Sequence, residues 1–222
     1  MSSSDLDEST LELWEEVRDR FVRERVLTCA GGLAARDFSV IAVPFVSEAN
    51  RSILGLIGRH TTVYYCDDPT LEETGILDTL SARGNTVKDA SAEFTRRSRR
   101  RGLGPGDVYM TSACAITLDG ILVHLGPEAI PAFTAGMEPG AVVVVAGVNK
   151  IVDDLEEGFR RAKDVCVPQY ARRMGLKLRC VASGNCVECD SPPPICTVHT
   201  VVTRKPDRPD IVVVVIGERL GY

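Results

Sequence analysis

The sequence predicts one α/β domain with a mostly parallel β-sheet flanked by helices. Short β-branched and apolar segments alternate with segments of helical periodicity, which is the pattern of βαβ units. The segment Ala141–Gly147 is wholly apolar, as expected of a central parallel strand that is buried on both faces. No internal repeat or long low-complexity linker interrupts the 222 residues. We therefore expect an N-terminal helical segment, residues 1–37, and an α/β domain, residues 38–222.

The first elements are predicted from periodicity and from breaker residues. Apolar residues at helical spacing predict an amphipathic helix from about Asp7 to Val26, and Gly31-Gly32 should end the pattern. Ser39–Phe45 is short and β-branched, so it predicts the first strand. Pro44 lies at the end of this segment, which indicates an edge strand or a strand end. The next helix is expected to begin near Ser47.

The rest of the chain continues the alternation. The pair Asp119-Gly120 predicts the tight turn of a hairpin within Ile116–His124. Asp68 or Thr70 can cap the helix that follows the second strand. Further strands are expected at Thr61–Tyr65, near Val87, and at Asp107–Ala113, Val198–Thr203 and Ile211–Ile216. Further helices are expected at Leu71–Ala82, Asp153–Lys163 and Pro168–Met174.

Composition and charge narrow the class of protein. The chain is 44% hydrophobic and 26% charged, with a net charge of −5, which argues against a nucleic-acid-binding function. The basic run Arg96–Arg101 is therefore interpreted as a solvated loop in preference to an anion patch. No apolar run approaches the roughly 18 residues that a membrane span needs, and no targeting segment is visible. A cytoplasmic protein is expected, in which thiols stay reduced.

Four of the eight cysteines are clustered with the spacing C-x5-C-x2-C-x6-C in a Cys-rich segment, 180–196, expected to be a loop. Thiolates are ligands for zinc and for iron–sulfur clusters, so this segment is a candidate structural zinc site or a redox-active cluster such as 4Fe-4S. The spacing matches neither the standard ferredoxin run nor the usual zinc finger, and four free or redox-active thiols remain an alternative. His199 could replace one ligand, although a single histidine at a strand start is more often packed or exposed. The candidate metal ligands are Cys180, Cys186, Cys189 and Cys196.

A second group of candidates follows the strand that ends near Ala113. Ligands of open α/β sheets bind at the carboxyl ends of strands, where Ser112 and Thr117 offer hydroxyl groups. Cys114 and Thr117 are the catalytic candidates. Cys114 has no evident His or Asp partner nearby in the sequence, and His124 lies ten residues further on.

A third group lies after the apolar strand. Gly147, Asn149 and Lys150 could bind a small anion through backbone N–H groups and one ammonium charge. The alternative is that Gly147 only permits a turn and that Lys150 is solvated. The segment is not a Walker or NAD fingerprint.

Several segments together resemble the LUD-domain proteins, the LutC/YkgG-type proteins associated with lactate utilisation. The resemblance runs from roughly Phe38 to the C-terminus and includes the Cys-rich segment. It implies a fold like the NagB/RpiA/CoA-transferase group and a role beside iron–sulfur proteins that oxidise L-lactate to pyruvate. The other segments that carry it are Thr111–Gly120, Gly147–Val152, Pro168–Met174 and Val215–Gly221.

The chain departs from the family pattern where a ligand is expected to bind, so it is identified as a divergent member. Cys114 stands where the family usually has asparagine. Cys66-Asp67-Asp68 replaces a Gly-Gly-Ser-type turn, and Val123–Pro127 replaces an Asn-Ile-Asp-Gly stretch and a Gly-Asn-Arg. Ligand and activity could therefore have shifted.

The predicted function is support of the oxidation of L-lactate or a related 2-hydroxy acid, with a metal or iron–sulfur centre on the four cysteines. Iron–sulfur or other oxidoreductase proteins are the expected partners, and a small anion is the expected ligand. The alternative is a non-catalytic ligand-binding or regulatory domain with a structural zinc. Fold analogy alone suggests a third function, a transferase or ligase acting on a phosphorylated or CoA-type ligand. The oligomeric state and whether the chain is an enzyme by itself are left open.

Overall fold

The computed structural model describes residues 8–90, 104, 106–126, 140–189 and 194–222, without the side chains of 8–15 and 194. The basic run Arg96–Arg101 lies outside these residues. No helix in the described ranges is both long and apolar enough to cross a membrane.

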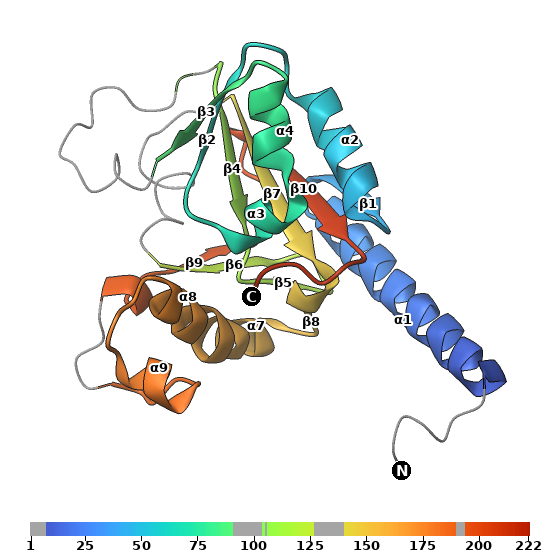
Figure 1. Ribbon diagram of the computed structural model, residues 1–222, viewed down its shortest axis with the longest axis vertical. Helices are drawn as coiled ribbons and strands as arrows, with labels where there is room; N and C mark the ends of the chain where they lie inside the picture. The colour runs from blue at the N-terminus through green and yellow to red at the C-terminus, as the bar shows by residue number, and fades with distance from the viewer. Residues whose placement is uncertain (1–7, 91–103, 105, 127–139, 190–193) are drawn as a thin grey trace.

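The central element is a six-stranded sheet in which every pairing is parallel, which confirms the mostly parallel α/β prediction (Figure 1). Its strand order is β1-β10-β7-β4-β2-β3. The two long apolar strands, β7 and β10, are adjacent within it and are buried along most of their length, as the apolar run predicted. Pro44 follows the edge strand β1 directly, so both predictions made for it are confirmed. The strands are β1 (Ser39–Val43), β2 (Thr62–Tyr65), β3 (Thr86–Asp89), β4 (Val108–Ser112), β7 (Ala141–Gly147) and β10 (Asp210–Ile216).

A second, smaller sheet of mixed strands lies against the first, and the sequence did not distinguish it from the main sheet. Its order is β8-β5-β6-β9. The β5–β6 pair is antiparallel, which confirms the predicted Asp-Gly hairpin, and β5 pairs with β8 in parallel. The strands are β5 (Ala115–Thr117), β6 (Leu122–Leu125), β8 (Ile151–Val152) and β9 (His199–Val202).

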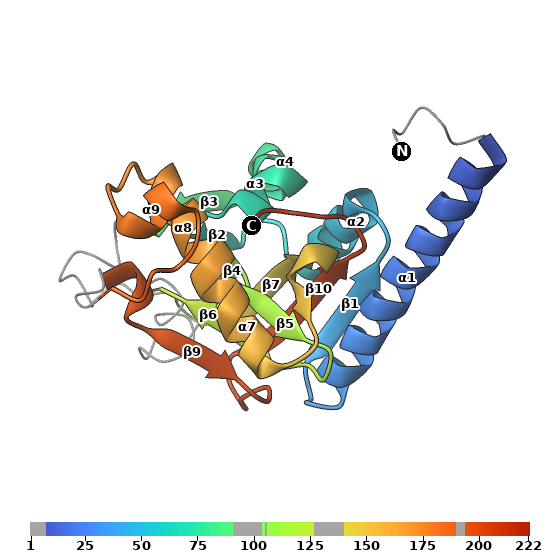
Figure 2. The ribbon, with the colours of Figure 1, turned by 90° about the horizontal axis from the view of Figure 1, so that it is seen from below.

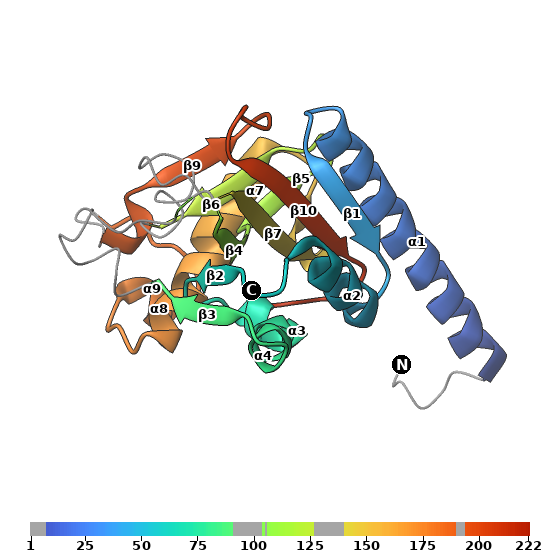
Figure 3. The same cartoon turned by 90° about the horizontal axis from the view of Figure 1, so that it is seen from above.

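Helices and sheets stack in layers, visible from two directions in Figures 2 and 3. One face of the main sheet packs on three helices, and its other face packs on α1 and the small sheet. Alternate residues of β7 point to opposite faces of the sheet. Val143 and Val145 face the three helices, whereas Val142 and Val144 face α1 and the small sheet. The far face of the small sheet packs on α7 and the turn after it. The helices are α1 (Glu8–Ala34), α2 (Val46–Leu56), α3 (Pro69–Thr74), α4 (Ile76–Ala82), α7 (Leu155–Arg161), α8 (Val167–Arg173) and α9 (Arg179–Ser183).

The prediction that Gly31-Gly32 ends the first helix is wrong, because α1 continues to Ala34. Gly32 lies against the turn between β5 and β6. A Cβ atom on Gly32 would come within 2.3 Å of the carbonyl oxygen of Leu118. The glycine therefore permits close packing of a helix on a turn and does not break the helix.

The two helices predicted at Asp153–Lys163 and Pro168–Met174 are one continuous rod. A π-helical turn, η3 (Ala162–Cys166), joins α7 to α8. In this turn the N–H of Val167 donates to the carbonyl of Ala162, five residues earlier. Proline has no N–H to donate, so the wider turn before Pro168 lets the helix continue past it.

Other boundaries also differ from the predictions. Gly75, in the left-handed region at φ 65°, divides the helix expected at Leu71–Ala82 into α3 and α4. Cys180 lies on the short helix α9, so the prediction of a loop for the whole Cys-rich segment is wrong. Gly184, at φ 82°, ends α9 as a left-handed cap. Pro194–Cys196 forms a 3-10 turn, η4.

Candidate functional site

A polar pocket lies at the carboxyl ends of β2 and β4 and beside the residues that follow β7. The chain goes from β2 to β3 on one side and returns with β4 on the other, so the strand order reverses at this pocket. Ligands of open α/β sheets bind at such reversals. The far wall comes from β6, η3, α8, η4 and the last residue. The cavity volume is about 100 Å³.

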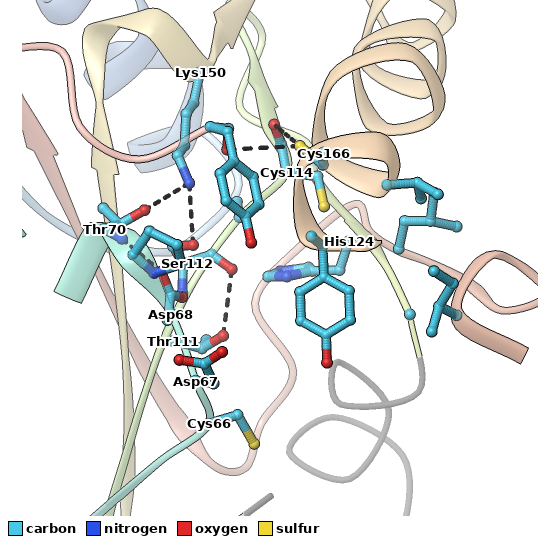
Figure 4. Close-up of a pocket in the computed structure, with 18 of the residues that line it drawn as sticks. Cys66, Asp67, Asp68, Thr70, Thr111, Ser112, Cys114, His124, Lys150 and Cys166 are labelled. Carbon is cyan, nitrogen blue, oxygen red and sulfur yellow. Dashed lines mark hydrogen bonds between the residues drawn. The ribbon is translucent and has the colours of Figure 1, made fainter. Parts of the chain in front are cut away.

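Every side chain that Figure 4 labels lines this pocket. They include carboxylates, hydroxyls, thiols, one histidine and one lysine. Its lining residues are Cys66, Asp67, Asp68, Pro69, Thr70, Tyr109, Thr111, Ser112, Ala113, Cys114, His124, Leu125, Gly126, Lys150, Cys166, Val167, Tyr170, Ile195 and Tyr222.

Lys150 supplies a buried positive charge. Its side chain is 2% exposed and reaches into the pocket from the 3-10 turn η2 (Val148–Lys150). The Nζ atom donates to Thr70 Oγ1 at 2.8 Å and to Ser112 Oγ at 3.1 Å. No carboxylate of the described residues forms an ion pair with it within 4 Å. A buried ammonium held only by neutral hydroxyls is incompletely neutralised, so the site favours an anion.

Asp68 holds the two hydroxyl residues in place. Its Oδ1 accepts from the N–H of Thr70 at 2.9 Å, which caps α3, as predicted, and Pro69 is the first helical residue. Its Oδ2 accepts from the N–H of Ser112 at 2.8 Å. One carboxylate therefore ties the start of α3 to the end of β4, the two elements that carry the partners of Lys150.

A pair of thiols, Cys114 and Cys166, lies on the opposite side of the pocket. Cys166 is on the π-turn, and its Sγ lies 3.7 Å from the carbonyl oxygen of Cys114. Arg161 binds both residues: its Nη1 donates to the Cys114 carbonyl and, at 3.2 Å, to Cys166 Sγ. The hydrogen bond from the Cys114 thiol, with help from Arg161 and Lys150, lowers the pKa of Cys166 to about 7 despite its burial. Donation of that hydrogen bond, together with burial, raises the pKa of Cys114.

Aromatic and heteroaromatic side chains also line the pocket, among them His124, Tyr109 and Tyr222. His124 is 3% exposed, and burial and then the Lys150 charge lower its pKa to about 4, so it is neutral at pH 7. The Tyr109 hydroxyl donates to Cys66 Sγ at 3.4 Å. Burial raises the pKa of Tyr222, so its phenol stays protonated. Neutral His124 and the protonated phenol of Tyr222 therefore add no charge to the pocket that Lys150 enters.

An ion pair ties the two walls together beside the pocket. Arg173 on α8 donates two hydrogen bonds to Asp67, from Nε to Oδ2 at 3.0 Å and from Nη2 to Oδ1 at 2.6 Å. Its Nη2 also donates to Oε1 of Glu72 on α3 at 2.5 Å. The hydrogen bond from Arg173 lowers the pKa of Asp67. The turn Cys66-Asp67-Asp68 thus provides a thiol, a wall-to-wall ion pair and a helix cap.

The residues predicted for an anion site are only partly brought together. Lys150 and Ser112 meet in the pocket. Asn149 instead binds the C-terminal segment, donating to the carbonyls of Leu220 and Gly221 and accepting from the N–H of Leu220. A Cβ atom on Gly147 would come within 2.5 Å of the Glu218 carbonyl oxygen.

Thr117 and Cys114, the catalytic candidates, lie in different surroundings. Thr117 is buried in the hairpin turn, where its hydroxyl donates to Asp119 and accepts from the N–H of Ile121 at 2.8 Å. Cys114 lines the pocket together with His124. Its thiol partner, Cys166, was missed because it is 52 residues away in the sequence. The only local signal for Cys166 is its position two residues before Pro168.

The four clustered cysteines lie close to the pocket but outside it. Ile195, next to Cys196, lines the pocket, and α9 with Cys180 packs on α8. Burial first, and then the charges of the neighbouring thiolates, raise the pKa of both Cys180 and Cys196. In the described part of the chain no three potential ligands converge as a formed metal shell would. The four thiols thus influence one another electrostatically without enclosing a metal position.

The fold and the pocket define an α/β protein with a small polar cavity at the carboxyl edge of a parallel sheet. The sequence matches the LUD domain over residues 30–216, so the chain belongs to the LUD domain family. No curated protein matches the chain.

The solved structures that are similar to this chain include the following two. One is a DUF162 family protein from Deinococcus radiodurans, with 14% identity and a TM-score of 0.47, covering 88% of this chain and 98% of that one. The other is eIF2B delta from Chaetomium thermophilum, with 19% identity and a TM-score of 0.34, covering 69% of this chain and 58% of that one.

Proposed function

We propose that this protein binds the carboxylate of L-lactate or a related small 2-hydroxy acid at Lys150 and supports the oxidation of that acid by partner oxidoreductases. The observation that carries the proposal is the buried ammonium of Lys150, which donates to two neutral hydroxyls. A carboxylate seated between Thr70 and Ser112 would neutralise this charge and accept its remaining N–H donor. The family's association with lactate utilisation supports the choice of acid.

The size of the cavity favours a ligand of this kind. About 100 Å³ accommodates a few heavy atoms, whereas sites for larger ligands are typically about 300–1,000 Å³. A three-carbon acid therefore suits the pocket better than a CoA-type ligand. Neutral His124 and protonated Tyr222 surround the position with groups that can hydrogen-bond a hydroxyl without repelling the acid.

The proposal includes an iron–sulfur centre on Cys180, Cys186, Cys189 and Cys196. Neighbouring thiolates that raise one another's pKa are relieved by a cation, so the donor set suits a soft metal or a cluster. A bound cluster would supply one-electron transfer close to the pocket wall at Ile195. Since the thiols do not converge in the described geometry, the segment has to close around the metal when it binds.

Calorimetric titration tests the ligand. L-Lactate and glycolate are expected to bind the wild-type protein, and Lys150→Met is expected to weaken binding at least tenfold, about 1.4 kcal/mol. Lys177→Met, at an exposed position, is the matched control and should bind as the wild type does. Absence of binding by any small hydroxy acid, or equal binding by Lys150→Met, would refute the proposed ligand.

Metal analysis tests the centre. Anaerobically purified protein should contain iron and acid-labile sulfide, and Cys186→Ser should lose both, whereas Cys66→Ser should keep them. Stoichiometric zinc in a colourless protein that unfolds with a chelator would instead support the alternative, a ligand-binding or regulatory domain with a structural zinc. Protein that contains neither iron nor zinc would rule out both centres. Ligand binding in the pocket would then still be tested by the calorimetric titration.

A further inference from the structure

Cys114 and Cys166 differ from the clustered cysteines in where they lie. They come from a loop after β4 and from a π-turn within the α7–α8 rod, and they meet in the wall of the pocket (Figure 4). Single π-turns are often found at functional positions, because the extra residue redirects a side chain. Here the turn directs the Cys166 sulfur to within 3.7 Å of the Cys114 carbonyl oxygen and 3.6 Å of a main-chain oxygen of Tyr222.

The charges around Cys166 stabilise its thiolate. Arg161 donates to the sulfur at 3.2 Å, and the Lys150 ammonium acts from across the pocket. The other titratable groups facing it are Cys114 and Tyr222, which stay protonated, and His124 on β6, which is neutral at pH 7. No carboxylate side chain is among these groups, so none of these side chains opposes ionisation of Cys166. A thiolate beside an arginine, reached through a pocket and adjacent to a second thiol, is the arrangement of a redox-active pair.

We propose that Cys166 and Cys114 form a redox-active thiol pair that reduces small hydroperoxides and closes to a disulfide. The Cys166 thiolate attacks the distal peroxide oxygen, which forms the S–O bond of a sulfenic acid and breaks the O–O bond; the leaving alkoxide or hydroxide takes a proton from solvent. The Cys114 thiol then attacks the sulfenic sulfur, releasing water and forming the disulfide. A small-molecule dithiol returns both sulfurs to thiols and is itself oxidised to a disulfide.

Peptide mapping tests the pair directly. Trypsin leaves Cys114 as the one cysteine of the peptide 102–150 and Cys166 as the one cysteine of 164–172. After brief treatment with hydrogen peroxide and blocking of remaining thiols, the non-reduced digest should contain these two peptides joined, with the loss of two hydrogens. In Cys114→Ser the product should stop at a sulfenic acid on Cys166, trapped by dimedone. Cys29→Ala, in the core on α1 and outside the pocket lining, should give the joined peptides like the wild type.

The pH dependence of alkylation tests the activation without a disulfide. In the wild-type protein Cys166 should react with iodoacetamide with a midpoint near pH 7, and Arg161→Met should move the midpoint to higher pH. Circular dichroism shows whether Arg161→Met is folded. If this variant is unfolded, the pH profile of alkylation in the wild-type protein still tests the proposal. Cys166 that reacts no faster than buried Cys66 in native protein, or peroxide products that join other cysteines instead, would overturn the proposal. Neither outcome depends on binding of a hydroxy acid or on the metal content.

Discussion

Gly32 on α1 and Gly120 in the β5–β6 turn pack backbone against backbone. A Cβ atom added to Gly120 would lie 2.3 Å from the carbonyl carbon of Gly32. A Cβ atom added to Gly32 would lie 2.6 Å from the carbonyl carbon of Asp119. This contact seats the C-terminal part of α1 on the small sheet, and Arg36 reinforces it by an ion pair to Asp119 at 2.5 Å. The small sheet in turn provides His124 in the pocket wall.

Gly32→Ala is expected to destabilise the protein by ~1–3 kcal/mol, because the added methyl meets backbone atoms that cannot move aside cheaply. Gly31→Ala is the matched control. Gly31 is exposed and has nothing within 4 Å of an added Cβ, so the higher helix propensity of alanine should stabilise the helix by up to about 1 kcal/mol. Urea unfolding of both variants measures the difference, and two changes of the same sign would contradict the packing role of Gly32.

The buried His124 should make stability depend on pH. Its pKa is about 4 in the folded protein and about 6.5 in an unfolded chain, so between these values the unfolded state binds more protons. Stability is therefore expected to fall as the pH drops from 6.5 to 4, by roughly 3 kcal/mol from this residue. His124→Leu should flatten that part of the profile. His60→Asn, at an exposed position, is expected to retain the wild-type profile, and a wild-type slope in His124→Leu would count against the prediction.

Asp68→Asn is expected to weaken both stability and anion binding. An amide offers one acceptor oxygen, so one of the N–H groups of Thr70 and Ser112 loses its partner, at a cost of ~1–3 kcal/mol. Because these residues hold the Lys150 ammonium, the affinity for L-lactate should fall as well. Asp78→Asn, exposed in the first turn of α4, is the control. Thermal unfolding and calorimetry separate the two effects; an unchanged affinity would show that Asp68 only caps the helix.

Arg173 should couple energetically to Asp67. Both side chains are about one-third exposed, at 35% and 30%, so solvent screens the pair and a coupling energy of ~0.2–1 kcal/mol is expected. A double-mutant cycle with Arg173→Met and Asp67→Asn measures it. Arg172→Met, one residue earlier and exposed, should show no coupling to Asp67. The hydrogen bond from Arg173 lowers the pKa of Asp67, so the contribution is present at neutral pH and is lost as acid protonates the carboxylate.

The amino-acid sequence by itself determined the features that depend on local patterns. The apolar run of β7 predicts a strand buried on both faces, Asp119-Gly120 predicts the hairpin turn, and Asp68 predicts a helix start. These features could be predicted because side-chain periodicity and backbone sterics act within a few residues. Family resemblance added the LUD domain. Lys150 was selected from its place after a central strand, and it is the most buried of the predicted residues that line the pocket.

Tertiary structure alone decided the contacts between distant segments. Between Gly32 and Gly120 the chain forms strands β1 to β5 and helices α2 to α4. The close approach of the two glycines shows that Gly32, predicted to break the helix, is a packing residue. The π-turn before Pro168 brings Cys166 to Cys114 from 52 residues away, and Arg161 joins them. Such contacts are set by how whole elements pack, which depends on the complementary surfaces of both partners and leaves no periodic trace in either segment.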